Sequence, residues 1–442
     1  MDIKINRHAK SLISIAATVV MFVFILISYD ASADISLRLT VAAFFSLVYL
    51  LALLIFTFRK EIDRVSAFLF GALAAAALVY IRVCMLYYPS ADYTTFLTNW
   101  VARMRELSVI DAIRAPIGDY NMPYMYLLLI IAKLPFDELV MIKFVSCIFD
   151  VLLVFSVMLT VGKLTNSKKA ALISFVAALS LPTVILNGSM WAQCDSIYGF
   201  FVVMCFYYIL ERKGGRAISM FALAFSFKLQ AIFVLPAIIV AIFSGHLKPK
   251  KFVWLPIGFL ATCLPALIFG RSFANTFMVY INQTQSYEHL DMNCPTVWRL
   301  VSNVSFDNFN AAGVMLGGLA AITIIYLGFI KRESIGDKEL TLFFALSAIA
   351  IVFFLPRMHE RYYFLADVLS LILFFSNRKL WFVPAVVVFS SYVAYAYYLF
   401  GGITLVKYVY LSLAILTVLG ILVSKIYRIP SGTKKVIKNG KA

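Results

Sequence analysis

The chain has 442 residues, of which 63% are hydrophobic and 14% are charged. Soluble domains are roughly 45–50% apolar and about 25% charged, so this composition excludes an ordinary soluble protein and predicts many membrane crossings. The formal net charge of +17 does not indicate a nucleic-acid partner, because the basic residues cluster in short loops between apolar segments. Such loops are typical of topology signals and of contacts to anionic membrane lipids.

Three membrane spans are predicted in the N-terminal part of the chain, at about 11–29, 37–58 and 65–87. Each is close to the ~20 apolar residues that cross a hydrocarbon core as a helix. Basic residues before the first span place the N-terminus inside, whereas the loop "DASADIS" carries none and is expected outside. The polar stretch at 89–121, which follows the third span, is therefore also expected outside.

The next apolar segment, 122–136, is short for a span and contains a lysine, Lys133. Counting it as a span would put the basic loop "GKLTNSKK" outside, against the positive-inside rule. We therefore predict a juxtamembrane helix on the outer surface. Together with the amphipathic stretch at 93–107, it makes 89–137 one large outer loop with juxtamembrane helices.

Spans are then predicted at about 138–162, 170–187 and 196–211. Only about 28 apolar residues separate the basic loops "ERKGGR" and "HLKPKK", which predicts two half-length helices meeting at an outer-facing break near "FKLQ". Further spans are predicted at 252–270, 309–330, 340–356, 361–376, 380–402 and 405–426.

The predicted fold class is therefore all-α, a polytopic integral membrane protein with about 14 transmembrane helices and both termini inside. We expect a single transmembrane domain over 1–442. Its parts are the N-terminal spans (1–88), the outer loop (89–137), the catalytic spans (138–376), and the C-terminal spans with a basic cytoplasmic tail (377–442).

Six polar clusters interrupt the apolar sequence, and this topology places all of them on the outer side. They are "YYPSADYTTF" (87–96), "PIGDYNMPYMY" (116–126), "NGSMWAQCDSIYG" (187–199), "FKLQ" (227–230), "QTQSYEHLDMNCPTVWRL" (283–300) and "RMHERYYF" (357–364). One such cluster suits an ordinary solvated loop. Six on one face, rich in aromatic, acidic and amide side chains, predict a single shared cavity.

Asp92 stands at the start of the long outer loop, a few residues after a predicted helix end. From there its carboxylate can face a cavity at membrane level and act as a general base toward a hydroxyl. It is equally suited to cap the amphipathic stretch at 93–107. The residue alone leaves both interpretations open.

The motif "WAQCDS" holds Trp191, Gln193, Asp195 and Ser196 where one predicted helix leaves the membrane and another begins. A tryptophan at this depth is often a belt residue of the membrane interface. A tryptophan beside an amide and a carboxylate is also suited to stack on a sugar and hydrogen-bond its hydroxyls. The sequence again leaves both interpretations open.

Lys228, Arg357 and Arg361 are cations on the outer side, against the charge bias of the chain. They are suited to bind a phosphate, although snorkelling to the interface is the alternative. A helix predicted to begin near Arg361 would add free backbone N–H groups for the same anion. His359 is then the candidate for assisting the departure of the phosphate, while Glu360 would orient Arg361 or His359 or bind the sugar.

A metal site has little support, because Asp92, His359 and Glu360 do not form an HExxH or similar spacing. No cofactor is therefore expected, with a divalent metal as the alternative. The candidate substrate-binding residues are Asp119, Tyr120, Asn121, Trp191, Gln193, Asp195, Ser196, Lys228, Gln230, Arg357, His359, Glu360, Arg361 and Tyr362.

Several of these motifs resemble the GT-C class of glycosyltransferases. The similar features are an acidic residue early in the first long outer loop, a juxtamembrane helix that begins with proline and tyrosine, and the motifs "GSMWAQCDSIY", "SFKLQA" and "MHERYYF". The resemblance covers roughly 90–364. It is to bacterial mannosyltransferase-like proteins related to the GPI-anchor pathway and, more distantly, to the lipid-phosphate-glucose-dependent glucosyltransferases of N-glycan assembly.

The resemblance implies an inverting hexosyltransferase that moves a mannose- or glucose-type sugar from a polyprenyl-phosphate donor to a lipid-linked or surface glycan acceptor. By the resemblance, Asp92 matches the catalytic base, and the tryptophan, amide and carboxylate of "WAQCD" match the sugar-side motif. Lys228, His359, Glu360 and Arg361 match groups near the donor phosphate. The chain departs from members with a double-acid motif, because only Asp92 precedes the amphipathic stretch.

Two other classes of function remain open at this point. A lipid-linked-sugar flippase or transporter would need charges near the middle of the membrane, and the predicted spans contain few of them, such as Lys143 and Asp150. A polysaccharide polymerase or acyltransferase would share the outward-facing Arg and His residues. The short loops favour a bacterial cytoplasmic membrane, with the active site on its outer face.

Overall fold

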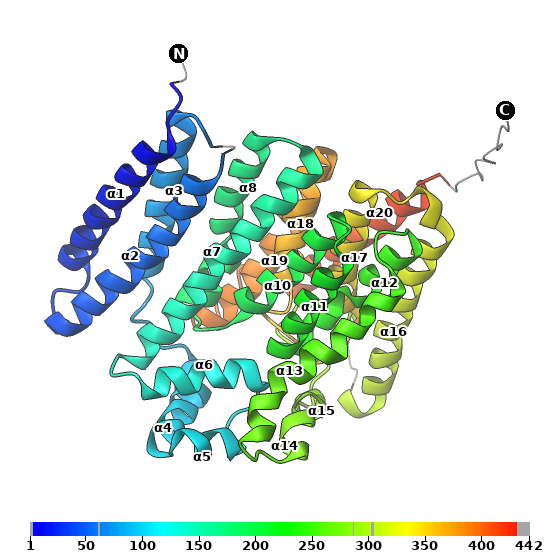
Figure 1. Cartoon of the computed structure of the whole chain (residues 1–442). Coiled ribbons are helices and arrows are strands. Elements are labelled where there is room, and N and C mark those ends of the chain that lie inside the picture. The colour runs from blue at the N-terminus through cyan, green and yellow to red at the C-terminus, as the bar shows by residue number, and fades with distance from the viewer. Residues whose placement is uncertain (1–2, 61, 286, 302–304, 431–442) are drawn as a thin grey trace.

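The computed structural model describes residues 3–60, 62–285, 287–301 and 305–430, and all of its long elements are helices (Figure 1). Its strands β1 (Asp291–Met292) and β2 (Met358–His359) have two residues each and pair in parallel, with Asp291 opposite Met358. The all-α prediction is confirmed. Most of the expected basic tail, at 431–442, lies outside the described residues.

The N-terminal spans form three helices, α1 (Arg7–Ser28), α2 (Ile35–Phe58) and α3 (Val65–Val83). Two of them begin at a side-chain cap. Asn6 accepts a hydrogen bond from the backbone N–H of Ala9, and Asp34 accepts one from that of Ser36. α1 and α2 pack on each other and α2 packs on α7, so the three helices form one flank of the bundle (Figure 1).

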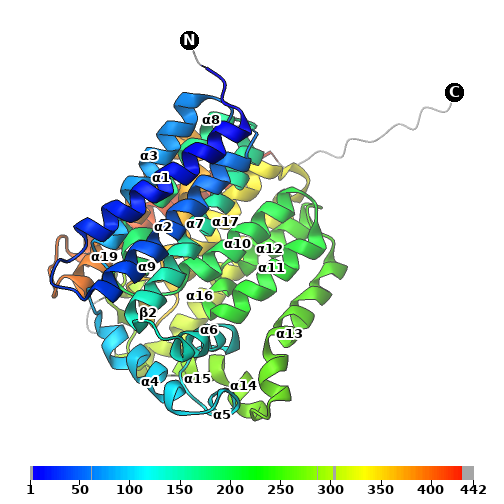
Figure 2. The ribbon, with the colours of Figure 1, turned by 60° about the vertical axis from the view of Figure 1, so that its left-hand side comes forward.

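The predicted outer loop is helical and lies at one end of the bundle (Figures 1 and 2). Its elements are the π-helical turn η1 (Tyr93–Leu97), α4 (Thr98–Glu106), α5 (Val109–Arg114) and α6 (Met122–Lys133). α6 begins where Asn121 accepts the N–H of Met122, and its last residue, Lys133, donates to the carbonyl oxygens of Arg105 and Leu107. These bonds hold α6 across the end of the bundle.

The centre of the bundle begins with a 28-residue helix, α7 (Glu138–Thr165). It is followed by α8 (Lys168–Leu179), α9 (Pro182–Ser189), α10 (Asp195–Leu210), α11 (Gly214–Phe227), η2 (Leu229–Val234) and α12 (Leu235–Phe243). The predicted break near "FKLQ" is confirmed, because α11 ends at Phe227 and Lys228 has an extended backbone before η2 begins. This break turns the chain back at the end of the bundle where α6 lies.

The remaining elements complete the bundle around α17 (Asp337–Phe354), whose residues from 340 to 353 are all buried. They are η3 (Pro249–Val253), α13 (Trp254–Ile268), α14 (Phe273–Phe277), α15 (Val279–Gln285), η4 (Val297–Leu300), α16 (Phe306–Lys331), η5 (Arg332–Ser334), α18 (Phe364–Ser376), η6 (Arg378–Leu380), α19 (Phe382–Leu399) and α20 (Tyr408–Tyr427). α13 packs on α11 and stands out from the bundle in Figure 2.

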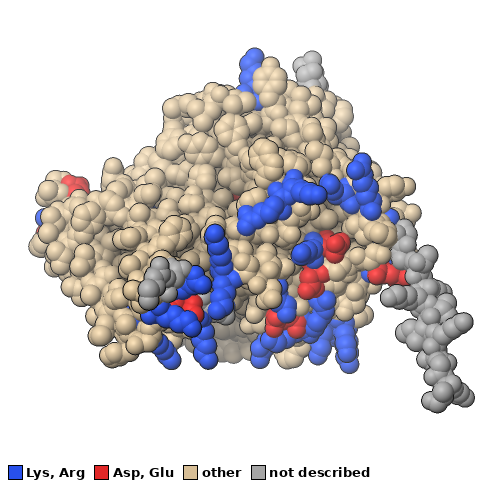
Figure 3. Space-filling model, turned by 90° about the horizontal axis from the view of Figure 1, so that it is seen from above, with Lys and Arg blue, Asp and Glu red and all other residues tan. Residues whose placement is uncertain are grey.

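The two ends of the bundle differ in charge. We call the end with the loops at 59–64, 166–167, 211–213, 244–248 and 332–336 the basic end, and Figure 3 shows Lys and Arg side chains gathered on it. The opposite end carries α4, α5, α6, α14 and α15 and the turns at 190–194 and 355–363 (Figure 1). All six polar clusters of the sequence lie toward this second end.

Eight helices among the described residues are long and apolar enough to cross a membrane, or nine if α8 and α9, bent by 49°, form one span. The eight are Arg7–Ser28, Ile35–Phe58, Val65–Val83, Glu138–Thr165, Pro249–Ile268, Phe306–Ser334, Arg378–Leu399 and Tyr408–Tyr427. The chain is therefore an all-α integral membrane protein.

Three charged residues inside the bundle, Arg82, Lys143 and Asp150, are bound by other groups of the bundle. Arg82 of α3 donates from Nε to Asp150 of α7 over 2.8 Å, and both side chains are fully buried. Asp150 also accepts the hydroxyl of Ser196. Lys143 donates to the carbonyl oxygens of Met85, Leu86 and Tyr88, at 3.1, 2.7 and 2.7 Å, and so closes the end of α3. These three charges therefore hold neighbouring helices together.

We expect Lys143→Met to lower the unfolding temperature in detergent. The substitution keeps most of the side-chain volume but leaves three buried carbonyl groups without their donor, and one hydrogen bond to a charged group contributes about 1.5–3 kcal/mol. Differential scanning fluorimetry measures the change. Lys250→Met, at an exposed position of η3, is the control and should unfold like the parent. Equal unfolding temperatures for all three proteins would contradict this role of Lys143.

Candidate functional site

A cavity of about 960 Å³ opens at the end of the bundle opposite the basic end. Each of the six polar clusters contributes lining residues to it, so the prediction of one shared cavity is confirmed. Eleven of the candidate site residues line it, namely Asp92, Asp119, Tyr120, Gln193, Lys228, Gln230, Arg357, His359, Glu360, Arg361 and Tyr362.

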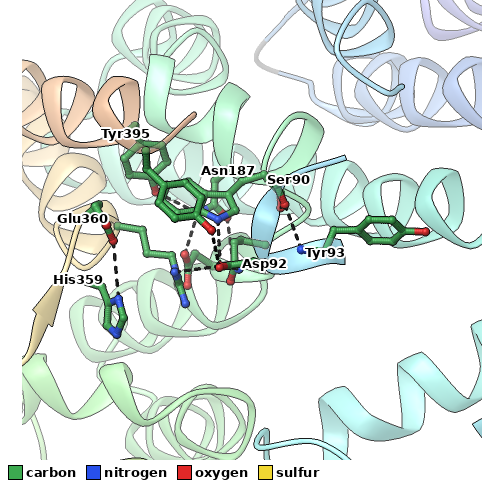
Figure 4. Close-up of polar contacts among 12 residues, drawn as sticks. Ser90, Asp92, Tyr93, Asn187, His359, Glu360 and Tyr395 are labelled. Carbon is green, nitrogen blue, oxygen red and sulfur yellow. Dashed lines mark hydrogen bonds and ion pairs between the residues drawn. The ribbon is translucent and has the colours of Figure 1, made fainter. Parts of the chain in front are cut away.

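The carboxylate of Asp92 is the centre of the polar contacts in this cavity (Figure 4). Its Oδ2 accepts hydrogen bonds from Trp191 Nε1 at 3.0 Å, from Gln193 Nε2 at 2.7 Å and from Arg361 Nη1 at 3.2 Å. Its Oδ1 accepts the hydroxyl of Tyr398 at 2.6 Å. Four donors from three other parts of the chain therefore meet on one carboxylate.

These contacts keep Asp92 ionised. Burial alone would raise the pKa of its carboxyl, but the charge of Arg361 and the hydrogen bonds from Tyr398 and Trp191 outweigh burial, so the pKa lies below its ordinary value. The side chain is only 18% exposed. At neutral pH, Asp92 is thus an anion whose two oxygens are already occupied by hydrogen-bond donors.

The helix-cap interpretation of Asp92 is wrong. Its side chain makes no capping hydrogen bond to η1. Ser90 does this instead, since its Oγ accepts the N–H of Tyr93 at 3.2 Å while its hydroxyl proton is donated to the carbonyl oxygen of Trp191 at 2.6 Å (Figure 4). Ser90 therefore joins the start of the outer loop to the "WAQCDS" turn.

Trp191 is fully buried behind the cavity and does not line it, so the belt interpretation is also wrong. Its ring stacks on Tyr398 at 4.3 Å between centroids and 13° between planes, and it meets Tyr395 edge-on at 4.9 Å. The guanidinium of Arg361 lies 5.4 Å from its ring centroid. Trp191 holds the groups that bind Asp92 and offers no open face to a sugar.

Lys228, at the break between α11 and η2, forms a buried ion pair with Asp195. The other oxygen of Asp195 accepts Asn187 Nδ2 at 2.7 Å, and the same amide donates to the hydroxyl of Tyr395 at 2.9 Å (Figure 4). The ammonium of Lys228 reaches the cavity and lies 5.7 Å from the ring centroid of Tyr120. Asp195 therefore supports Lys228 from behind, at 2% exposure.

Two more candidates lie away from the cavity. Ser196 donates to Asp150 within the bundle, so it stabilises the Arg82 ion pair. Asn121 is 1% exposed and caps α6. Neither residue lines the cavity, and their contact with substrate stays a prediction.

The stretch 357–361 crosses the cavity as β2 and a turn, and α18 begins only at Phe364. The prediction of a helix start near Arg361 is therefore wrong by three residues, and the turn separates Arg361 from the helix N-terminus. Arg357 has a φ of +63°, which is uncommon for a residue with a side chain, and its guanidinium lies 4.8 Å from the ring centroid of Phe306. Its backbone N–H donates to the carbonyl of Leu290 at 2.9 Å.

His359 is packed between the rings of Tyr287 and Tyr362, at centroid distances of 4.8 and 5.1 Å. Its Nδ1 lies 3.6 Å from Oε2 of Glu360, and Oε1 of Glu360 accepts Asn293 Nδ2 at 3.4 Å. Burial lowers the pKa of His359, and Glu360 offsets only part of this effect. The imidazole is therefore neutral at pH 7 and can donate one hydrogen bond. The side chain of Glu360 faces His359 and Asn293, and Arg361 is instead paired with Asp92.

Asp119 and Tyr120 lie directly before α6 and line the cavity. The hydroxyl of Tyr120 donates to Gln193 Oε1 at 3.2 Å, and the amide of the same Gln193 donates to Asp92. Asp119 is exposed to the cavity space. Enclosure by the surrounding protein raises the pKa of its carboxyl and the charge of Asp92 adds to this, while Arg361 and Lys228 act in the opposite direction.

The metal alternative of the sequence analysis concerns Asp92, His359 and Glu360. Among the described residues, no group of three or more His, Cys, Asp or Glu side chains lies close enough together to hold one. The oxygens of Asp92 are bound by four donors, and one of them is the cation Arg361. Asp92, His359 and Glu360 therefore do not form the ligand set that their residue types suggested.

Tyr398 and Tyr395 are site residues that the sequence analysis missed. Both lie on α19, in a segment predicted only as a span. The signal was the spacing of aromatic residues at 392, 395 and 398, which places one aromatic stripe along the C-terminal end of that helix.

Comparison with known proteins adds no further candidates, because no family model matches the chain and no curated protein matches it.

The buried His359 predicts a pH dependence of stability. Its pKa is lower in the folded than in the unfolded state, so the unfolded chain binds more protons near pH ~6.5, and stability falls as pH decreases through that value. We expect the unfolding temperature to fall between pH ~7.5 and ~5.5, and His359→Gln to flatten this dependence. His246→Gln, at the basic end, is the comparison for a second histidine whose pKa burial lowers. An unchanged slope in His359→Gln would contradict the assignment.

Proposed function

We propose that the protein is an inverting membrane glycosyltransferase that moves a hexose from a polyprenyl-phosphate donor to a lipid-linked or surface glycan acceptor. The observation that carries this proposal is the composition of the cavity. Carboxylates, at Asp92 and Asp119, and cations, at Lys228 and Arg361, meet in one cavity at the end of a membrane bundle. A glycosyl phosphate needs both kinds of group.

The reaction assigns a separate task to each kind of group. A hydroxyl of the acceptor attacks the anomeric carbon, the bond from that carbon to the phosphate oxygen breaks, and the phosphate leaves with the electron pair. Lys228 and Arg361 stabilise the negative charge on the departing phosphate. His359, neutral and buried, donates a hydrogen bond to it. A cavity carboxylate accepts the proton of the attacking hydroxyl.

The wall of the cavity supports a lipid-linked donor. Ile232 of η2 and Val314 of α16 both line the cavity, and they are 39% and 54% exposed. An apolar side chain at a membrane-facing position contacts lipid tails rather than water. A polyprenyl chain can therefore lie along this wall while its phosphate reaches Lys228.

The rival functions fit the same residues less well. A flippase or transporter needs polar groups along a path between the two ends of the bundle, whereas Arg82, Lys143 and Asp150 are used up in contacts within the bundle. A polymerase or acyltransferase would use the same cations but gives no role to a buried aspartate held by Trp191 and Gln193. We keep both as outcomes of the donor assay.

We also propose a GT-C-like arrangement with about 14 spans. The nine candidate spans reach this number when the shorter helices α10, α11, α12 and α18, together with α17, cross the membrane as well. The basic end then faces the cytoplasm, by the positive-inside rule. Both termini lie on the cytoplasmic side of a bacterial membrane, and the cavity opens on the outer side.

Cysteine labelling tests this orientation in intact cells. In a background without native cysteines, we expect Thr404→Cys, in the exposed turn before α20, to react with a membrane-impermeant maleimide. Lys250→Cys, exposed at the basic end, should react only after the membrane is opened. The reverse pattern would place the cavity on the cytoplasmic side and remove the proposed access to surface acceptors.

Donor turnover tests the reaction itself. We expect the purified protein to transfer the sugar of a polyprenyl-phosphate hexose to a lipid-linked acceptor without added nucleotide. Arg361→Gln should weaken donor affinity by about 1–3 kcal/mol, the range for a hydrogen bond to a charged group. Arg114→Gln, on exposed α5 outside the cavity, is the matched control. Parent protein that binds no such donor would sink the proposal, and equal affinity in both variants would remove Arg361 from the phosphate site.

A further inference from the structure

Three carboxylates line the cavity. Glu360 accepts Asn293 Nδ2 and faces His359, whereas Asp92 and Asp119 stand in opposite environments. Asp92 accepts four hydrogen bonds from side chains, one of them from a guanidinium. Asp119 accepts none from the side chain of any other described residue, although it lines the same cavity. A base must offer a free lone pair to the proton that it removes. Of Asp92 and Asp119, only Asp119 does so without a rearrangement.

The position of Asp119 is fixed by its neighbour. Tyr120 is bound through its hydroxyl to Gln193, and Gln193 is bound to Asp92. The carbonyl oxygen of Asp119 also accepts the side-chain amide of Gln283, from α15. The backbone on both sides of the carboxylate is therefore held, while the carboxylate itself stays open to the cavity.

We propose that Asp119, and not Asp92, is the proton acceptor of the transfer reaction, and that Asp92 is a positioning residue. This inference rests on the proposed function. In the step, the acceptor oxygen forms its bond to the anomeric carbon as the carbon–phosphate oxygen bond breaks. The hydroxyl proton passes to the carboxylate of Asp119, and the phosphate keeps the bonding electron pair. Asp92 holds Arg361, Trp191 and Gln193 in place around this event.

The electrostatics agree with this division. The pKa of Asp119 is raised and that of Asp92 is lowered. A general base is most effective when its pKa approaches the working pH, so Asp119 is the stronger proton acceptor of the pair. Asp92 contributes to this difference, because its negative charge raises the pKa of Asp119.

Turnover of a polyprenyl-phosphate hexose by purified variants tests the assignment. We expect Asp119→Asn to lower kcat by about 10²-fold or more, the loss typical of a missing general base. Asp119→Glu should retain part of the activity, because it keeps a carboxylate. Asp111→Asn, on exposed α5, is the matched control. Unfolding temperatures equal to that of the parent show that the variants are folded.

The pH profile separates a base from a positioning residue. The parent should lose kcat/KM on the acidic side as Asp119 takes up a proton. Asp92→Asn should raise KM and move this acidic limb to lower pH, because the charge that raises the pKa of Asp119 is gone. A merely structural role of Asp92 would leave the limb in place. If instead Asp92→Asn abolishes the acidic limb and Asp119→Asn keeps it, the inference is overturned.

Carbodiimide labelling gives a second readout that needs no substrate. The reagent attacks protonated carboxyl groups, so at mildly acidic pH we expect peptide mass spectrometry to find modification at Asp119 and none at Asp92. Modification of Asp92 alone overturns the inference. Parent protein that transfers no sugar overturns the proposed function together with the base role, whereas an active parent with a fully active Asp119→Asn overturns the base role only.

Discussion

The arrangement of the cavity depends on one buried carboxylate, that of Asp92, which must stay ionised close to a membrane. An isolated carboxylate at such a place would take up a proton, because the low dielectric disfavours its charge. Arg361, Tyr398, Trp191 and Gln193 prevent this by donating to it. Those donors come from the turn after α9, the turn before α18 and the C-terminal end of α19. Asp92 can therefore stay ionised only when these three segments pack together around it.

Three other buried cations of the bundle are also matched by partners. Arg82 is matched by Asp150, Lys143 by three carbonyl oxygens, and Lys228 by Asp195. A buried charge without a partner is far more costly than a buried pair. Of these groups only Lys228 also lines the cavity. Of these three cations, the one available to a ligand therefore lies at the cavity end of the molecule.

Much of the fold could be predicted from the sequence, because hydropathy and basic loops report locally on each helix. The short α6, the break at Lys228 and the gathering of six polar clusters all follow from such local signals. The orientation of side chains within an element does not follow from local sequence signals. Trp191 and Ser196 belong to the expected motif, yet one packs behind the cavity and the other binds Asp150. Contacts of Asp92 span 99 to 306 residues of sequence, and local patterns carry no information on them.

This separation between motif and role bears on how the site works. In the sequence, Asp92 and Asp119 are chemically alike. Asp92 was assigned the role of base because the resemblance to glycosyltransferases matches it to an acidic residue early in the first long loop. Donors around Asp92 make it a fixed anion that organises a cation and two aromatic rings, whereas the open carboxylate of Asp119 is free to exchange a proton. Two like charges in one cavity need opposite environments to do different work. The many hydrogen bonds to Asp92 therefore favour a positioning and electrostatic role for its carboxylate. The few contacts of Asp119 favour a role in proton transfer.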